Sequence, residues 1–470
     1  MYKYDNGQLS LSEFGQPVGM RLSEDNRWVK KAKTIPWDAI EHRYAELFKN
    51  RKGNVAKPLR LALGACLIQA EYGYSDVEVA AMIQEHPYLQ YFCGYKEYDD
   101  SKLPFDPSLM VYFRKRLTPE VLGEINELII AKRDTVSPAS EDEDDDDDQN
   151  KGTMIVDATC APSQIKYPTD SALLDEAREN TEAMIDEMHT VGKKKPRTYR
   201  KRARKDYLAL ARSRKPGAKK TRKAIGKQLS YLRRNLKTIE AMLESGGVLS
   251  PQKQTRLETV QTLYEQQKYM YDKRTHSVPD RIVSLSQPWL RPIVRGKTGA
   301  AVEFGAKLDI SVVNGWTRLE VFSFDAYNES GGLSEMIERY HQRTGHDPKR
   351  ILADKIYRNR DNLAYCKGRG IRLSGPALGR PKKDAQVDKK QNYIDECERV
   401  EVERRFSLAK RKCGLGLITA KLEATACHCI AMSILALNLR RIQRALMDSF
   451  FMLLNFCRLN YPNGNLRFVQ

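Results

Sequence analysis

The segment Met154-Ile155-Val156-Asp157 decides the fold, because it is a short apolar run that ends on an aspartate. A second run of this kind, residues 350–353, ends on Asp354. Short apolar runs are typical of buried strands, and a carboxylate that directly follows such a run projects from the strand end into solvent. The sequence therefore predicts two strands that each carry an aspartate at one end.

Further strand and helix signals surround these two runs. Asn314-Gly315 separates strand-like runs at 302–313 and 318–324, and this dipeptide is a strong signal for a tight hairpin turn. The sequence also predicts a helix that begins at Ser334 and ends near Gly345, a short strand at 371–373 and a helix over about 395–412. This order of elements predicts an α/β fold built on a mixed sheet.

The last of these helices supplies a third carboxylate. In Arg399-x3-Glu403-x6-Lys410 the spacings of four and seven residues place all three side chains on one helix face, within roughly 40° of one another. A neighbouring apolar stripe would seat the helix on the sheet: Val402, Phe406 and Ala409. We expect Glu403 to face the two aspartates.

Three convergent carboxylates repel one another unless cations neutralise them. Two Mg²⁺ ions about 3.5–4 Å apart can activate a water or a 3′-hydroxyl and stabilise the leaving oxygen of an in-line phosphoryl transfer. We therefore interpret Asp157, Asp354 and Glu403 as catalytic ligands of two Mg²⁺ ions, for which Mn²⁺ can substitute. Each carboxylate taken alone fits an ordinary solvated surface position better, and it is the joint order of the three that favours catalysis.

Five stretches carry a resemblance to a known family: Ile155-Val-Asp-Ala-Thr-Cys-Ala-Pro162, Tyr167-Pro-Thr-Asp170, Ile351-Leu-Ala-Asp-Lys-Ile-Tyr357, Arg399 to Lys410, and His86-Pro-Tyr-Leu-Gln-Tyr-Phe92. They resemble the DDE transposases of bacterial insertion sequences, which have a ribonuclease H-like catalytic fold. The last stretch is similar to the helical N-terminal domain that accompanies it. The resemblance covers most of residues 15–445.

The resemblance implies roles for individual residues. Asp157, Asp354 and Glu403 match the catalytic triad, and Arg399 and Lys410 match basic positions of the third motif. Lys355, next to Asp354, joins these two as a candidate DNA contact. Many relatives have a tyrosine three residues before the arginine, where this chain has Glu396. Glu401 is the alternative third ligand, although it lies about 160° from Glu403 around the helix.

The resemblance also implies a reaction and partners. A transposase binds the terminal inverted repeats of its element, cleaves the strands there and joins the 3′-hydroxyl ends to target double-stranded DNA by transesterification. Pairing two ends implies a homodimer or a higher synaptic assembly. Two alternatives stay open: a metal-dependent nuclease without strand transfer, and a DNA-binding regulator derived from a transposase.

Composition shifts divide the chain. We expect a helical N-terminal domain at 1–135, an acidic linker at 136–150 and a ribonuclease H-like catalytic domain at 151–420. A helical insertion interrupts this domain at about 170–280, and a C-terminal helical segment follows at 421–470. Eight consecutive acids mark the linker, from Glu141 to Asp148. The N-terminal helices would bind the DNA ends, or form a plain helical bundle.

The positive charge of the chain is concentrated in the insertion. The chain has 80 Lys and Arg against 61 Asp and Glu, a net charge of +19, and residues 191–240 hold 20 of these bases against two acids. Such a segment fits duplex DNA, and a solvated helical surface is the alternative. The candidate contacts here are Arg200, Lys201, Arg202 and Arg204. Heptad spacing between 225 and 243 predicts a helical hairpin.

Other classes of protein fit the sequence poorly. The first twenty residues have no apolar stretch, and no apolar run is long enough to span a bilayer, so we expect a soluble cytoplasmic protein that associates with the nucleoid when bound to DNA. Nine scattered cysteines suggest reduced thiols. Cys427-His428-Cys429 lacks the paired ligands of a zinc finger, which argues against a structural zinc site.

Overall fold

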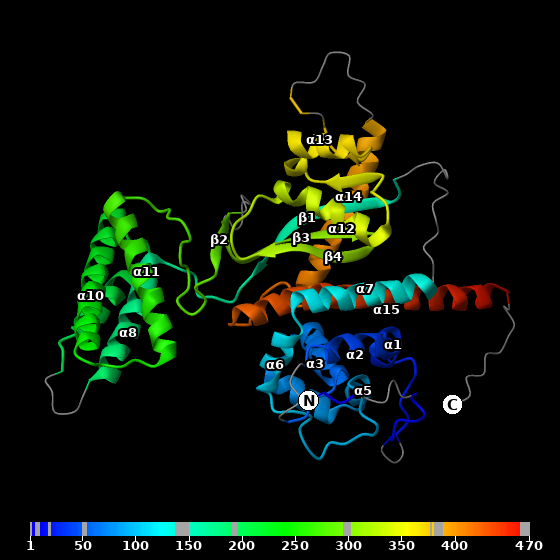
Figure 1. Ribbon diagram of the computed structural model, residues 1–470, viewed down its shortest axis with the longest axis horizontal. Helices are drawn as coiled ribbons and strands as arrows, with labels where there is room; N and C mark the ends of the chain where they lie inside the picture. The colour runs from blue at the N-terminus through cyan, green and yellow to red at the C-terminus, as the bar shows by residue number, and fades with distance from the viewer. Residues whose placement is uncertain are drawn as a thin grey trace.

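The computed structural model describes residues 2–4, 10–16, 20–48, 54–136, 150–189, 195–294, 302–376, 378–379 and 389–460. The acidic run that the sequence predicts as a linker, Glu141 to Asp148, lies outside these residues. Figure 1 shows a mixed sheet with helices on it, an N-terminal group of helices below it and a separate helical unit at one side. The α/β fold with a mixed sheet is confirmed.

The N-terminal part is all helical within the described residues. Ser75 caps α4 through a capping box with Glu78, as its position before the helix predicts. The Thr118 hydroxyl accepts from the Val121 amide at the start of α7, where Pro119 is the first helical residue. The helices are α1 (Arg27–Thr34), α2 (Trp37–Ala45), α3 (Leu59–Tyr72), α4 (Asp76–Glu85), α5 (Pro87–Phe92), α6 (Leu109–Arg116) and α7 (Pro119–Val136).

The sheet has a mixed order, with β1 at its centre. β1 is antiparallel to β3 on one side and parallel to β5 on the other, β6 is parallel to β5, and β4 and β2 both pair with β3. The predicted hairpin turn is confirmed, since Asn314 and Gly315 both have positive φ, 50° and 74°. The strands are β1 (Thr153–Pro162), β2 (Arg291–Val294), β3 (Val302–Val313), β4 (Trp316–Ser323), β5 (Arg350–Ala353) and β6 (Arg372–Leu373).

Helices cover both faces of this sheet. On one face the predicted stripe of α14 (Lys389–Lys412) is buried, and Val402, Phe406 and Ala409 pack with Ile155 and Leu352. On the other face α12 (Leu333–Thr344) and α13 (Arg360–Gly368) form a second core with the opposite side chains of β1 and β5. Side chains two residues apart on a strand point to the same face of the sheet, so Asp157 lies on the face where Ile155 contacts α14.

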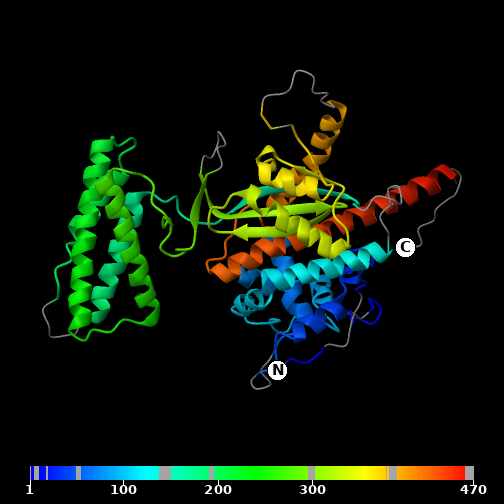
Figure 2. The same ribbon diagram turned by 45° about the horizontal axis from the view of Figure 1, so that its top comes forward.

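The C-terminal helix α15 (Glu423–Asn460) joins the N-terminal helices to the sheet. It packs along α7, α3 and α6 and against β4, and α7 and α15 run side by side below the sheet (Figures 1 and 2). The buried Asn438 amide donates to Asn126 of α7 and to the Thr317 carbonyl of β4. The C-terminal helix thus shares one core with the N-terminal helices.

The insertion between β1 and β2 is a bundle that stands apart from the sheet (Figures 1 and 2). It contains α8 (Asp170–Met188), α9 (Arg200–Ala211), α10 (Ala218–Glu244) and α11 (Pro251–Lys273), two helices more than the predicted hairpin. The heptad seam is buried, with Leu229, Leu232 and Ile239 in its core. Among the described residues, no helix is long and apolar enough to cross a membrane.

Candidate active site and DNA-binding surface

Asp157 and Asp354 leave the sheet side by side. Val156 of β1 pairs with Ala353 of β5 in parallel register, so the next residue of each strand lies at the same edge. Asp157 keeps only 19% of its side chain exposed, and its Oδ1 accepts from the Ala158 amide at 2.8 Å. Asp354 is exposed, and its Oδ1 accepts from the Lys355 amide at 2.6 Å. The topology thus brings the two predicted aspartates together.

Glu403 lies on α14, and the Arg399 side chain connects it to Asp157 at this edge. The Arg399 guanidinium lies between the two carboxylates, with Nη1 3.9 Å from Asp157 Oδ2 and Nη2 3.4 Å from Glu403 Oε1. Glu403 has 55% of its side chain exposed. Glu401 instead turns to its own helix, where its Oε1 contacts Arg405 Nη2 at 2.6 Å. The geometry therefore favours Glu403 over Glu401 as the third carboxylate.

The donor set is chemically suited to Mg²⁺, which prefers carboxylate oxygens. In the part of the chain that the structure describes, no three His, Cys, Asp or Glu side chains converge closely enough to hold a metal ion. The positive group between Asp157 and Glu403 is Arg399. Burial raises the pKa of Asp157 to about 6, with Asp354 adding repulsion, so a cation there would stabilise the ionised form. Metal binding at these oxygens requires Arg399 to move aside.

The other predicted basic residues lie near the same edge. Lys355 is exposed in the 3₁₀ turn η2 (Lys355–Tyr357), directly after Asp354. Lys410 is partly buried on α14, two turns beyond Glu403. Lys355 follows Asp354 directly in the chain, and Lys410 shares α14 with Glu403.

Asp309 is a buried carboxylate that sequence reasoning missed. It lies on β3 opposite Ala158, with Oδ1 accepting from the Tyr327 hydroxyl at 2.9 Å. Its Oδ2 has no hydrogen-bond partner among the described residues, and neither does the nearby buried hydroxyl of Tyr357. Burial raises the pKa of Asp309 to about 7, and Glu329 adds repulsion. Lys307, Asp309 and Ser311 alternate with apolar residues, which is the usual pattern of a strand with one solvated face, so the sequence carries no signal that Asp309 is buried.

The pKa shift of Asp309 predicts a pH-dependent stability. A carboxyl whose pKa is raised in the folded state stabilises the fold at low pH, and this contribution is lost as the pH rises through about 7. In the metal-free protein we expect the free energy of unfolding to fall by on the order of 3 kcal/mol between pH 4 and pH 8 from this group. Asp309→Asn should flatten that part of the profile in urea titrations, and an unchanged profile would contradict the assignment.

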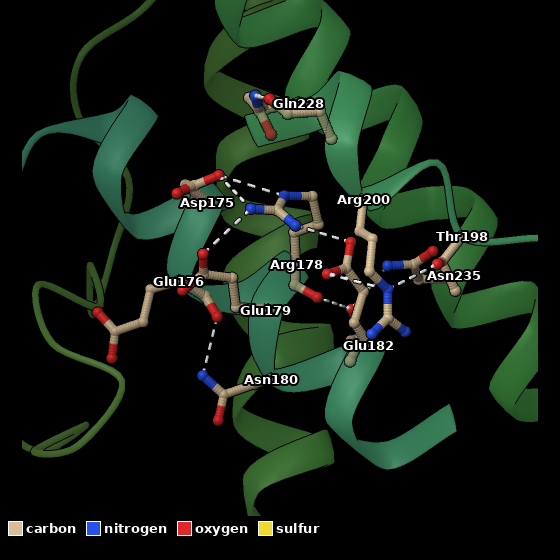
Figure 3. Close-up of polar contacts among 12 residues, drawn as sticks. Asp175, Glu176, Arg178, Glu179, Asn180, Glu182, Thr198, Arg200, Gln228 and Asn235 are labelled. Atoms are coloured by element: carbon tan, nitrogen blue, oxygen red, sulfur yellow. Dashed lines mark hydrogen bonds and ion pairs between the residues drawn. The ribbon is translucent and has the colours of Figure 1, made fainter. Parts of the chain in front are cut away.

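The four candidate DNA contacts in the insertion have different surroundings. Arg200 binds Asp186 with both Nη atoms at 2.9 Å. Its Nε donates to the Thr198 hydroxyl at 3.2 Å and lies 4.0 Å from Glu182 (Figure 3). Its charge therefore holds α9 on α8. Lys201, Arg202 and Arg204 are exposed on α9, so these three are available to a polyanion.

A basic groove of about 670 Å³ lies beside these residues, between α9, α10 and α11. Four tyrosines lie among the basic side chains that line the groove, and the Arg234 guanidinium stacks on the Tyr199 ring at 4.4 Å. Two of the lysines are paired, Lys227 with Asp206 and Lys268 with Asp272. The bases are Arg202, Lys223, Lys227, Arg233, Arg234 and Lys268. Stacked guanidinium groups are fixed in place, which favours binding of phosphates.

The Cys427-His428-Cys429 segment has a structural role. His428 is fully buried, and its Nδ1 lies 2.7 Å from the Leu117 carbonyl oxygen, which joins α15 to the end of α6. Burial lowers the pKa of His428 to about 4, so the ring is neutral. The segment therefore helps to pack the C-terminal helix.

Comparisons with known proteins agree with this geometry. Residues 351–440, which hold Asp354 and Glu403, match the family model described as transposase DDE domain. Residues 17–116 match a second model, transposase domain DUF772. A protein of Rhizobium meliloti, uncharacterized protein ORF8 in nfe locus, is 30% identical over 148 residues, which cover 31% of this chain and 66% of that protein.

No solved structure matches the chain. The two family models cover different parts of the fold, one the N-terminal helices and the other the segment from β5 into α15. Both describe transposase domains, and the match over residues 351–440 includes the strand end and the helix from which Asp354 and Glu403 project. The two matches, over residues 17–116 and 351–440, together support an insertion-sequence DDE transposase.

Proposed function

We propose that the chain binds the terminal inverted repeats of its element, cleaves the strands there by metal-dependent hydrolysis and joins the 3′-hydroxyl ends to target DNA. One observation carries the proposal: Asp157 and Asp354 leave adjacent parallel strands at one edge, and Arg399 links Asp157 to Glu403 on the helix above. The strand order β4-β3-β1-β5-β6, with β3 antiparallel to its neighbours, supports a ribonuclease H-like sheet.

In this proposal Asp157, Asp354 and Glu403 hold two Mg²⁺ ions, with Mn²⁺ as a substitute. Bound there, the ions would lower the pKa of a water or a 3′-hydroxyl and stabilise charge on the leaving oxygen. Arg399, released from the carboxylates, would bind a phosphate next to the reacting one, because a guanidinium matches phosphate geometry. Lys355 and Lys410 would hold the same strand from either side.

The insertion is the proposed second DNA contact. Its exposed α9 bases and its groove form a positive surface that stands away from the sheet, so a duplex could bind the insertion and the active site together (Figure 2). Since two ends must be paired, we propose a homodimer or a larger assembly.

The reaction product distinguishes transposition from simple cleavage. The DNA that flanks the encoding gene should contain inverted repeats bordered by short direct duplications, and a duplex with these ends is the substrate to use. Incubated with Mg²⁺ and a target plasmid, the protein should yield cleaved ends and then joined molecules. Cleavage without joining would support the nuclease instead, and binding without cleavage would support the regulator.

Neutralising the exposed α9 bases should weaken duplex binding. Each phosphate contact contributes about 0.9 to the slope of log affinity against log salt. The Lys201→Gln, Arg202→Gln, Arg204→Gln variant should therefore bind a labelled duplex with a slope lower by about 2–3. Fluorescence anisotropy at several salt concentrations measures this. The control is Arg360→Gln with Lys367→Gln, on the exposed side of α13. If the salt slope changes by the same amount per removed charge in the α9 variant and in the control, the α9 bases have no specific role in DNA binding.

A further inference from the structure

A groove of about 600 Å³ lies between α14 and α15, beside the helix face that carries Glu403. Its charged lining comes from both helices and is strongly one-sided. Among the residues that the structure describes there, five arginines face one glutamate: Arg404, Arg405, Arg411, Arg441, Arg444 and Glu401. A concave surface with this excess of guanidinium groups attracts anions.

The glutamate offsets only part of this charge. Glu401 binds Arg405 at 2.6 Å and lies 3.8 Å from Arg404 Nη1. Within the described ranges, Arg411, Arg441 and Arg444 form no ion pair, and the Arg411 Nε donates to the Ser407 carbonyl of its own helix. The Arg411 and Arg444 charges are therefore left for a ligand, whereas Asp134 and Glu401 partly offset the charge of Arg441.

Two donors in the groove are buried without an acceptor. Arg405 Nε and Arg441 Nη1 are both shielded from solvent, and neither makes a hydrogen bond within the described residues. Leaving a buried donor unpaired costs free energy, which an anionic oxygen would recover. Burial and the Arg405 charge also lower the pKa of the Arg441 guanidinium.

The hairpin turn between β3 and β4 fixes Arg441 in place. Its guanidinium stacks on the Trp316 ring at 4.2 Å. It also lies against Gly315, where a Cβ would be 2.6 Å from the Arg441 Nη2. Arg441 is thus held by the sheet before any ligand arrives, which lowers the entropy cost of binding.

The spacing along α14 suits a nucleic acid strand. Arg404 and Arg411 are seven residues apart, about 10.5 Å along the helix at about 1.5 Å per residue. Successive phosphates of one DNA strand rise by about 3.4 Å along the duplex axis and also turn around it, so neighbouring phosphates lie farther apart than this rise. The two side chains are far enough apart to contact two different phosphates of one strand.

We propose that this groove binds the phosphate backbone of duplex DNA, on the side of α14 next to the active-site carboxylates. The inference rests on the proposed action on DNA and adds a second backbone contact on the catalytic helix. The duplex would lie along α14, so that one stretch of its backbone faces Glu403 and the next stretch enters the groove. The chain's own residues 446–470 contain one acid, Asp448, and offer little charge to fill it.

The test is duplex binding by the Arg411→Gln, Arg444→Gln variant. Both side chains are exposed and form no ion pair among the described residues, so their loss leaves no buried acid unpaired. A Glu403→Gln background prevents cleavage during the measurement. We expect the salt slope of binding to a labelled 40-base-pair duplex to fall by about 2, and the affinity to fall on the order of tenfold. The control, Arg360→Gln with Lys367→Gln, removes the same charge from α13 and should leave both unchanged.

The outcomes separate this inference from the proposed function. If the groove variant and the control have equal slopes, the groove does not bind DNA, whether or not the wild type cleaves. If the slope falls only in the groove variant while the wild type fails to cleave, the groove assignment holds and the catalytic proposal is wrong. Restoring the positive charges with Arg411→Lys and Arg444→Lys should restore most of the slope.

Discussion

Replacing Asp157 by asparagine is expected to reduce strand cleavage on the order of 10³-fold, and Asp354→Asn and Glu403→Gln should do the same. An amide keeps the shape of each side chain but removes the negative charge that would bind a cation. Single-turnover cleavage of an end-containing duplex with Mg²⁺ measures the loss. Binding of the same duplex in Ca²⁺ should change little, because the insertion and the groove supply most of the positive charge.

Glu401→Gln is the matched control, because it changes the same type of residue on the same helix. Glu401 pairs with Arg405 away from the strand ends, so its loss should leave cleavage within a few-fold of wild type. Wild-type cleavage by the variant at Asp157, Asp354 or Glu403 would remove that residue from the proposed site. If Glu401→Gln lost cleavage while Glu403→Gln stayed active, the third carboxylate of the site would be Glu401 instead of Glu403.

Replacing Arg178 by methionine should destabilise the insertion by about 3–5 kcal/mol. Arg178 is almost fully buried in α8, where it bonds to Asp175 at 2.6 Å and to Glu182 at 2.7 Å (Figure 3). Without it the buried Asp175 loses its ion-pair partner, and Glu182 keeps only the more distant Arg200 Nε at 4.0 Å. Hydrogen exchange of the α8 and α10 amides measures the effect and should accelerate there, while the sheet amides remain protected.

A second variant separates charge from packing. Replacing Asp175, Arg178 and Glu182 together by Leu, Met and Leu removes the buried charges as a set, and stability should return to near wild type. Glu179→Gln changes an exposed neighbour and should cost less than about 0.5 kcal/mol. If Arg178→Met leaves exchange unchanged, the buried ion network contributes nothing to the bundle.

Local sequence rules predicted the elements that position the candidate site. Asn314-Gly315 gave the hairpin because both residues tolerate positive φ, and the apolar runs before Asp157 and Asp354 gave the strand ends. The stripe at Val402 predicted the buried face of α14, and with it the direction of Glu403. Each of these features depends on residues close together in the chain.

Features that depend on distant partners could not be predicted. Arg200 is bound by Asp186 only because α9 folds back onto α8, so its charge is paired although the segment around it is strongly basic. Asp309, inside β3, accepts from the Tyr327 hydroxyl and is close enough to Glu329 for repulsion, and both partners belong to the segment that follows β4. Helix α15 packs beside α7, and the hydrogen bond between Asn438 and Asn126 spans more than 300 residues. These contacts follow from tertiary packing, which periodicity does not specify.

The central claim is that three carboxylates together hold the divalent ions that act on DNA. Titration of Mn²⁺ into the protein–duplex complex, followed by electron paramagnetic resonance, tests this directly. The wild type is expected to bind two ions, and the variant with Asp157→Asn, Asp354→Asn and Glu403→Gln combined should bind neither. If the triple variant bound as many Mn²⁺ ions as the wild type with the same affinity, the metal site would lie elsewhere and the account would be wrong.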